Sequence, residues 1–498
     1  MYLEHNSQKL FFREPFGAVG TGSTVTLRLA MAESGIPHCV KCIVYNKDKM
    51  LVEADMNFVF EICGKNIYSC TFTAPEEASI LWYCFRTDTD NGTYYYGNNT
   101  ALLGGEGKIY TAEPAFKFQI TVYDKAFKTP DWFKKSVAYQ IFPDRFFNPT
   151  GEINSERNDI IRRNWGEEPF YKAEQFGGEY LSNDFFGGTL KGIEQKLPYL
   201  KELGISVIYL NPIFKAFSNH RYDTGDYEEI DAILGNTEDF KSLCKSAKDC
   251  GIRIILDGVF NHTGSNSKYF NKNGEYDTVG AYQSDSSVYR DWFAFGNSRD
   301  EYECWWGMKT LPHTKLIIKR WLKCGASGWR LDVVDELPDF FVKELRENAK
   351  EALPDSVIIG EVWEDASNKI SYGTMREYFL GAELDSVMNY PLRNALIDLA
   401  LMNIDAQDFS KRIMSLKENY PRQVFYSCLN MVSSHDVERI LTVMSGVKKP
   451  DNRDEQSRFS LSGDLLETAK KRALAVTALQ MTLPGVPCVY YGDEIGMQ

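Results

Sequence analysis

The sequence is short of positive charge and of long apolar runs. Lys and Arg number 56 against 69 Asp and Glu, a formal net charge of −13 over 498 residues, so a nucleic-acid backbone is not an expected partner. No apolar run approaches the roughly 20 residues of a membrane-spanning helix, and we expect no membrane partner. The first residues, MYLEHNSQKLFF, lack the apolar core of a secretory signal.

Cysteine occurs in an odd number, eleven, spread over the whole chain. This is the pattern of free thiols in a reducing compartment, and we therefore predict a cytoplasmic protein. Hydrophobic residues make up 43% and charged residues 25%, values that are typical of a globular protein and exclude a disordered chain.

The pattern of apolar residues changes near residue 125. Residues 1–125 contain short alternating apolar runs between Gly, Asn and Asp turns, which predict an all-β sandwich domain. Residues 126–498 alternate apolar runs with helical patterns and predict an α/β fold, a (β/α)8 TIM barrel, in preference to a doubly wound sheet. The eight expected strands are 137–142, 206–214, 253–260, 328–334, 356–363, 385–391, 423–432 and 485–491.

Two features depart from a plain barrel. Residues 263–312 separate the third and fourth expected strands with no clean helix until their end, so we expect an inserted subdomain that walls a cleft. The chain also stops at Gln498, directly after the eighth expected strand. We therefore expect the barrel to be incomplete at its C-terminus.

Charged side chains gather where the expected strands end. Arg330 and Asp332 lie on the fourth strand, Glu361 ends the fifth, and His435-Asp436 follow the seventh. Because the carboxyl ends of barrel strands share one rim, we expect these groups to converge. Burying several carboxylates together is costly unless each is paired, and two carboxyl groups of different protonation are what glycosidic bond cleavage requires.

Each of these residues also has a structural interpretation. Asp257, at the end of the third strand, is expected to cap a helix or a turn. Arg330 and Asp332 face the same side of one strand and suit an ion pair, and Glu361 suits a solvated strand end.

Taken together, the motifs resemble the α-amylase family, glycoside hydrolase family 13. Four segments are similar to its signature regions and occur in its order: DGVFNH (257–262), GWRLDVVDE (328–336), GEVWED (360–365) and SSHD (433–436). The sandwich followed by PDWFKKSVAYQIFPDRF (130–146) resembles the neopullulanase, cyclomaltodextrinase and maltogenic amylase branch. In that branch a starch-associated module precedes the barrel, and a B-type subdomain is inserted after its third strand.

The resemblance implies Asp332 as nucleophile, Glu361 as general acid/base and Asp436 as transition-state stabiliser. Arg330 is expected to keep Asp332 ionised while Glu361 holds a proton. A retaining double displacement would follow, with the two carboxyl groups about 5–5.5 Å apart. The substrate-binding residues that the resemblance implies are His220, Tyr222, His262, Arg330, Trp363 and His435.

The substrate implied is an α-glucan oligosaccharide: a maltodextrin, a cyclodextrin or pullulan, hydrolysed at α-1,4 and, in part of the branch, at α-1,6 bonds. A 4-α-glucanotransferase or branching enzyme is an open alternative, since a sugar hydroxyl competes with water for the same intermediate. A non-catalytic α-glucan-binding protein on the same fold is another. The branch also implies a homodimer.

No cofactor is expected to be required. The calcium site of the branch would draw on Asn148, Asn154 and Asp159 here, but the turn that usually supplies an aspartate reads Gly187-Gly188-Thr189. Because losing a carboxylate weakens a site for a hard cation, calcium is a doubtful ligand of this chain.

Overall fold

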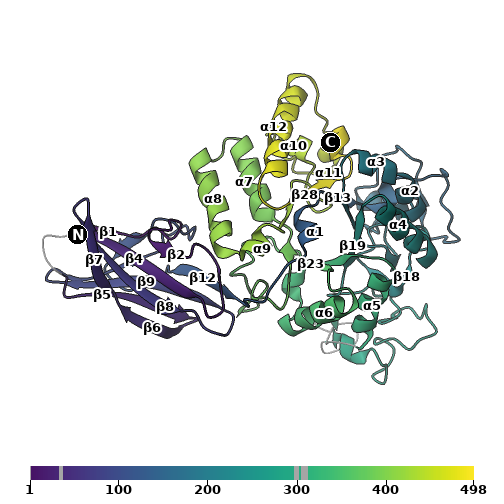
Figure 1. Ribbon diagram of the computed structural model, residues 1–498. Coiled ribbons are helices and arrows are strands. Elements are labelled where there is room, and N and C mark those ends of the chain that lie inside the picture. The colour runs from purple at the N-terminus through teal and green to yellow at the C-terminus, as the bar shows by residue number, and fades with distance from the viewer. Residues whose placement is uncertain (1, 33–36, 296–301, 304–311) are drawn as a thin grey trace. The chain divides into compact units, whose positions relative to one another are not determined.

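The computed structural model of the chain describes residues 2–32, 37–295, 302–303 and 312–498 (Figure 1). Its contacts divide into two compact units. The first unit is Met1–Thr129 with Glu364–Glu383 and Asn394–Tyr426, and the second is Pro130–Trp363, Leu384–Arg393 and Ser427–Gln498.

The first unit holds the predicted β-sandwich. One sheet has the order β1-β4-β8-β7, with β2 beside β4, and the other has β11-β10-β9-β12-β3, with β5 beside β9 and β6 beside β5. The strands of the first sheet are β1 (Tyr2–Glu4), β2 (Arg13–Glu14), β4 (Thr24–Ala32), β7 (Asn57–Ile62) and β8 (Lys65–Thr73). Those of the second are β3 (Val19–Gly20), β5 (Cys39–Asn46), β6 (Lys49–Asp55), β9 (Ser79–Thr89), β10 (Gly92–Gly97), β11 (Lys108–Tyr110) and β12 (Phe118–Tyr123).

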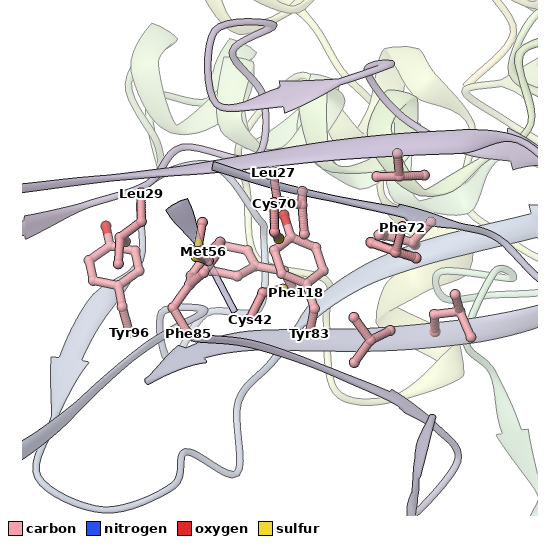
Figure 2. Packing of buried hydrophobic residues seen from close by; sticks show 14 of the residues in the cluster. Leu27, Leu29, Cys42, Met56, Cys70, Phe72, Tyr83, Phe85, Tyr96 and Phe118 are labelled. Carbon is pink, nitrogen blue, oxygen red and sulfur yellow. The ribbon is translucent and has the colours of Figure 1, made fainter. Parts of the chain in front are cut away.

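Alternation along the strands builds the core of this sandwich. Leu27 and Leu29, two residues apart on β4, lie fully buried between the sheets with Tyr83 of β9 and Phe118 of β12 (Figure 2). The rings of Tyr83 and Phe118 stack with their centroids 5.2 Å apart. Full burial of one such side chain contributes about 1.5–3 kcal/mol, so this pattern of alternate apolar residues is sufficient to pin the register.

A buried ion pair ties the sandwich to helix α8 (Ala406–Asn419), which belongs to the same unit. The Arg13 guanidinium donates to a carboxylate oxygen of Glu418 at 2.8 Å, and both side chains are almost fully buried. Arg13 also donates to the backbone carbonyls of Gln119 and Gly17. The N-terminal strands therefore depend on a residue located far along the chain.

The second unit is the predicted (β/α)8 barrel. Its eight strands pair in the order β26-β23-β22-β19-β16-β13-β28-β27, and a parallel bridge between Met388 and Leu429 joins the last strand to the first. Each strand falls inside its predicted segment. They are β13 (Ala138–Ile141), β16 (Val207–Leu210), β19 (Arg253–Gly258), β22 (Gly328–Leu331), β23 (Val357–Gly360), β26 (Ser386–Val387), β27 (Leu429–Met431) and β28 (Val486–Tyr490).

Helices alternate with these strands along the chain. The pattern that predicts a helix over 238–250 corresponds to α4 (Thr237–Asp249), whose first turn is capped by the Asn236 side chain. The strand predicted over 423–432 is wrong in its first part, because Arg422–Phe425 forms helix α9 after Pro421, a residue that readily begins a helix. The remaining helices are α1 (Asp131–Lys134), α2 (Leu190–Gln195), α3 (Leu197–Glu202), α5 (Pro312–Lys323), α6 (Asp339–Ala352), α7 (Tyr390–Ala400), α10 (Ile440–Val443), α11 (Arg453–Arg458) and α12 (Gly463–Thr482). Within the described ranges, no helix combines the length and the apolarity needed to cross a bilayer.

The predicted insertion, 263–312, lies only partly within the described residues. Its described part packs around aromatic side chains: the rings of Tyr269 and Trp292 stack at 4.9 Å, and the Tyr269 hydroxyl accepts a hydrogen bond from the backbone of Tyr227 on β18 (Thr224–Ile230). Two short strands, β20 (Ala294–Phe295) and β21 (Tyr302–Glu303), pair antiparallel.

Candidate active site

One guanidinium, that of Arg330, lies among three carboxylates at the carboxyl ends of β19, β22 and β23. Its Nη1 donates to both oxygens of Asp257, at 2.9 and 3.1 Å, and to Asp332 at 2.8 Å. Its Nη2 lies 2.8 Å from Oε2 of Glu361. This contact is an ion pair, and its geometry is not that of a hydrogen bond. The barrel thus brings together the predicted nucleophile and the predicted acid/base.

The sheet register explains this convergence. β19 pairs with β22 so that Asp257 lies opposite Arg330, and β22 pairs with β23 so that Leu331 lies opposite Gly360. Asp332 and Glu361 each follow directly after such a pair. Their side chains therefore rise from adjacent positions of neighbouring parallel strands, at the rim where barrel strands present functional groups.

Asp257 does not cap a helix or turn, and that expectation is wrong. Its carboxylate is fully buried and accepts hydrogen bonds from the hydroxyls of Tyr209 (2.6 Å) and Tyr222 (2.8 Å) as well as from Arg330. The local rule for a strand-end aspartate fails because a buried arginine on the next strand is a stronger partner than a backbone amide.

A chain of hydrogen bonds fixes Tyr222 and His435. The amide of Gln140 on β13 lies 3.0 Å from Nδ1 of His435 and can only donate there, so Nδ1 accepts and the proton lies on Nε2. Nε2 contacts the Tyr222 hydroxyl, which in turn donates to Asp257. Burial lowers the pKa of His435 well below its usual value, so the ring is neutral and its single N–H points into the site.

The other two predicted histidines flank Tyr222. Nδ1 of His220 accepts the backbone N–H of Tyr222 at 3.1 Å, which leaves its Nε2 to carry a proton. His262 hydrogen-bonds the backbone of the same tyrosine, and burial lowers the pKa of both rings. Both histidines therefore act as neutral N–H donors at neutral pH.

Glu361 has N–H donors at both oxygens. The backbone N–H of Val333 donates to Oε2 at 2.9 Å, and the indole N–H of Trp363 donates to Oε1 at 3.1 Å. The Trp363 ring stacks on Tyr390, with centroids 3.9 Å apart and an interplanar angle of 14°. Val333 has φ 39° and ψ 52°, a left-handed conformation that is costly for a β-branched residue.

The site holds more negative charge than Arg330 can neutralise. Burial raises the pKa of Asp332 to about 8, with the neighbouring carboxylates adding to the rise and Arg330 opposing it. Asp436, 3.3 Å from Nε2 of His435, has its pKa raised to about 6, again chiefly by burial. Burial and the neighbouring carboxylates thus act against Arg330 on the pKa of Asp332.

Two of the candidate calcium ligands, Asn148 and Asp159, already have partners within the chain. The Asp159 carboxylate is bound to the Arg157 guanidinium at 2.7 and 3.0 Å, and Oδ1 of Asn148 accepts the backbone N–H groups of Thr150 and Gly151. Among the residues that the structure describes, no group of three or more His, Cys, Asp or Glu side chains is placed to hold a metal ion. Calcium is bound by several oxygen ligands, and the oxygens of Asn148 and Asp159 accept hydrogen bonds from the chain instead.

Several residues of the site were not expected from the sequence. Three of them are buried on strands or at a helix start, where the sequence predicts core residues: Gln140, Tyr209 and Tyr390. The one signal in the sequence was strand alternation, which places residues two apart on the same face of a strand. Arg330 and Asp332 form one such pair. Tyr209 and Asn211 form another, and the Asn211 amide donates to the Tyr222 hydroxyl. Nothing local distinguishes Val333 from a core valine.

Fold and site define a barrel protein with a carboxylate cluster at its carboxyl-terminal rim. The family described as "Alpha amylase, catalytic domain" matches residues 140–310 and 305–498. The chain belongs to this family.

Individual relatives agree with the family match. The chain is 39% identical to an amylopullulanase of Thermoanaerobacter thermohydrosulfuricus, over 99% of this chain and 36% of the relative. It is 33% identical to neopullulanase 2 of Thermoactinomyces vulgaris, over 83% of this chain and 65% of the relative. A solved cyclomaltodextrinase structure superposes with a TM-score of 0.61 at 27% identity, covering 100% of this chain and 78% of that one. The chain spans 29 to 42% of three amylopullulanases that it matches.

Proposed function

We propose that this chain is a retaining glycoside hydrolase that cleaves α-1,4 and α-1,6 glucosidic bonds in α-glucan oligosaccharides. The observation that carries the proposal is the placement of Asp332 and Glu361 at adjacent positions of neighbouring strands. Parallel strands lie about 4.8 Å apart, a spacing compatible with the 5–5.5 Å between the carboxyl groups of retaining enzymes.

The proposed reaction has two steps. The ionised carboxylate of Asp332 attacks the anomeric carbon while Glu361 gives its proton to the departing glycosidic oxygen, which forms a covalent glycosyl ester. Water then attacks the same carbon, Glu361 takes the proton from it, and Asp332 leaves. Arg330, held by Asp257, carries the positive charge that stabilises Asp332 as a leaving carboxylate in the second step.

The neutral rings set the shape of the sugar site. His220, His262 and His435 present N–H groups around Tyr222, whose hydroxyl is held by Asp257 and Asn211. A flat aromatic face ringed by donors suits a glucosyl unit, with its apolar face and equatorial hydroxyls. We assign Asp436, beside His435, to stabilising the oxocarbenium-like centre.

The substrate class draws on the relatives as well as on the site. Their names include amylopullulanase, cyclomaltodextrinase and neopullulanase, which supports maltodextrins, cyclodextrins and pullulan as candidate substrates. A 4-α-glucanotransferase would use the same two carboxyl groups, so product analysis has to separate it from a hydrolase.

The test is reducing-sugar release from maltohexaose, β-cyclodextrin and pullulan by the chain and by its Asp332→Asn variant. We expect release by the parent, a fall of at least about 10⁴-fold in kcat in the variant, and an α-anomer as first product by NMR. Longer oligosaccharides than the substrate would favour transfer. Binding of maltohexaose by a well-folded parent without any turnover would refute the enzyme and leave a binding protein.

A cytoplasmic location, a homodimer and independence from metal ions belong to the same proposal. The relative named intracellular maltogenic amylase, of Bacillus subtilis, supports the location, and the resemblance to the branch supports the dimer. Cell fractionation and light scattering after size-exclusion chromatography test these two points.

A further inference from the structure

The hydrogen bonds to Glu361 are unequal in how easily they can be broken. At Oε2 the partner is the backbone N–H of Val333, with Arg330 also 2.8 Å away. Val333 stays in its left-handed conformation although this costs on the order of 1–3 kcal/mol. A strained backbone persists only when its surroundings fix it, so the Val333 donor is a permanent part of the site.

At Oε1 the partner is a side chain at the surface. Trp363 is 44% exposed, and its ring packs with one face on the buried ring of Tyr390. Its exposed area is therefore on the opposite face and the edge. The indole N–H thus belongs to a partly exposed side chain, whereas the Val333 N–H belongs to a backbone segment that its surroundings hold in place.

We propose that Trp363 is a positioning residue for the acid/base, whose indole N–H holds Oε1 of Glu361 as the ionised oxygen between the two chemical steps. The proposal rests on the function proposed above. Because Oε2 is occupied by a fixed donor, Oε1 is the oxygen that exchanges a proton with the glycosidic oxygen and with water.

The proton balance follows from this assignment. In the first step the proton on Oε1 moves to the glycosidic oxygen, the bond from that oxygen to the anomeric carbon breaks, and the bond to Asp332 forms. The resulting carboxylate accepts the Trp363 N–H, a charge-assisted bond that is about twice as strong as a neutral one. In the second step water returns a proton to Oε1 and this bond weakens. Trp363 thus favours the glycosyl-enzyme over the starting state.

The other charged and titratable groups around Glu361 are the same in the parent and in the variant. Arg330 on β22, Asp257 on β19, Asp332 after β22 and Asp436 after β27 surround the carboxylate, and His435 is neutral. Replacing Trp363 by phenylalanine removes the N–H, keeps an aromatic ring over Tyr390, and touches none of these groups.

The experiment is the rapid-quench time course of maltohexaose cleavage by Trp363→Phe, measured beside steady-state kcat and KM. The substitution removes one charge-assisted hydrogen bond from the ionised Oε1 of the glycosyl-enzyme. We expect kcat to fall about 10-fold with little change in KM, and the burst of the first product to shrink, since the glycosyl-enzyme loses stability.

A matched control is available in the same barrel. Trp329 is fully buried on β22, next to Arg330, and its indole nitrogen has no hydrogen-bond partner in the described structure. Trp329→Phe applies the same substitution and should leave the burst as large as in the parent. A benzothienyl-alanine at position 363, which keeps the shape of the indole without its N–H, should reproduce the smaller burst of Trp363→Phe.

Two results would overturn the proposal. A higher KM in Trp363→Phe with an unchanged burst would make the ring a sugar platform only, and an equal loss of the burst in Trp329→Phe would make the effect non-specific. If the parent chain itself fails to hydrolyse maltohexaose, the proposed function fails, which the parent assay reveals before any variant is made.

Discussion

Replacing the proposed nucleophile should make the protein more stable at neutral pH. In Asp332→Asn the charge and the titration disappear while the shape is kept. Burial raises the pKa of Asp332 to about 8, against about 3.9 for an aspartate in an unfolded chain. Between these values the native state binds a proton that the unfolded state has released, so the stability of the parent falls as the pH rises.

The magnitude follows from the linkage relation. One excess proton lowers the free energy of unfolding by about 1.4 kcal/mol per pH unit, or roughly 3 kcal/mol from pH 5 to pH 7. The variant does not have this slope. It gives up the charged hydrogen bond to Arg330, which has a length of 2.8 Å and contributes about 1.5–3 kcal/mol. The variant should therefore be less stable than the parent by about 0–1.5 kcal/mol at pH 5 and more stable by about 1–3 kcal/mol at pH 7.

The assay is urea unfolding of parent and variant at pH 5, 6, 7 and 8, with tryptophan fluorescence as the signal. Asp451→Asn serves as the control, because Asp451 is 88% exposed and should give a difference that does not change with pH. A parent-to-variant difference that is flat from pH 5 to pH 7, or that favours the parent more at pH 7, would refute the electrostatic account of the site.

Three further results are expected. Glu418→Gln should lower the free energy of unfolding by about 3–5 kcal/mol, because it leaves Arg13 as a buried charge without its carboxylate; thermal melts measure this, and a drop below 1 kcal/mol would contradict it. Tyr222→Phe should reduce kcat/KM about 10–100-fold with little change in melting temperature, since the hydroxyl orders Asp257 and His435; an unchanged kcat/KM would count against that role. Dialysis against EDTA should leave hydrolysis unchanged, as Asp159 is bound to Arg157, and recovery of lost activity by added calcium would show that the ion is needed.

The barrel was predictable because its strands are short, buried and bounded by clear turns. Each of the eight strands lies within an expected apolar run, and the rule that strand ends share a rim placed Asp332, Glu361 and Asp436 near one another. The start of α9 was not predictable from the apolar pattern, since a short buried run suits either a strand or a helix.

The electrostatics of the site could not be predicted from the sequence. Asp257 looks like a helix cap when only its neighbours in sequence are considered, and its real partners, Tyr209, Tyr222 and Arg330, lie 35 to 73 residues away. The protonation of Asp332 depends on a balance between burial and a shared guanidinium, a quantity that exists only in three dimensions. The donors to Glu361 were missed for the same reason.

The buried pair between Arg13 and Glu418 has a consequence for synthesis on the ribosome. The two residues are 405 positions apart, and at about 5–20 residues per second the second emerges some 20 to 80 seconds after the first. Throughout that interval the nascent sandwich carries an uncompensated guanidinium where the finished protein has an ion pair. Its first strands must therefore complete their packing late, and a graft of residues 1–129 onto another barrel would need its own acidic residue to take the place of Glu418.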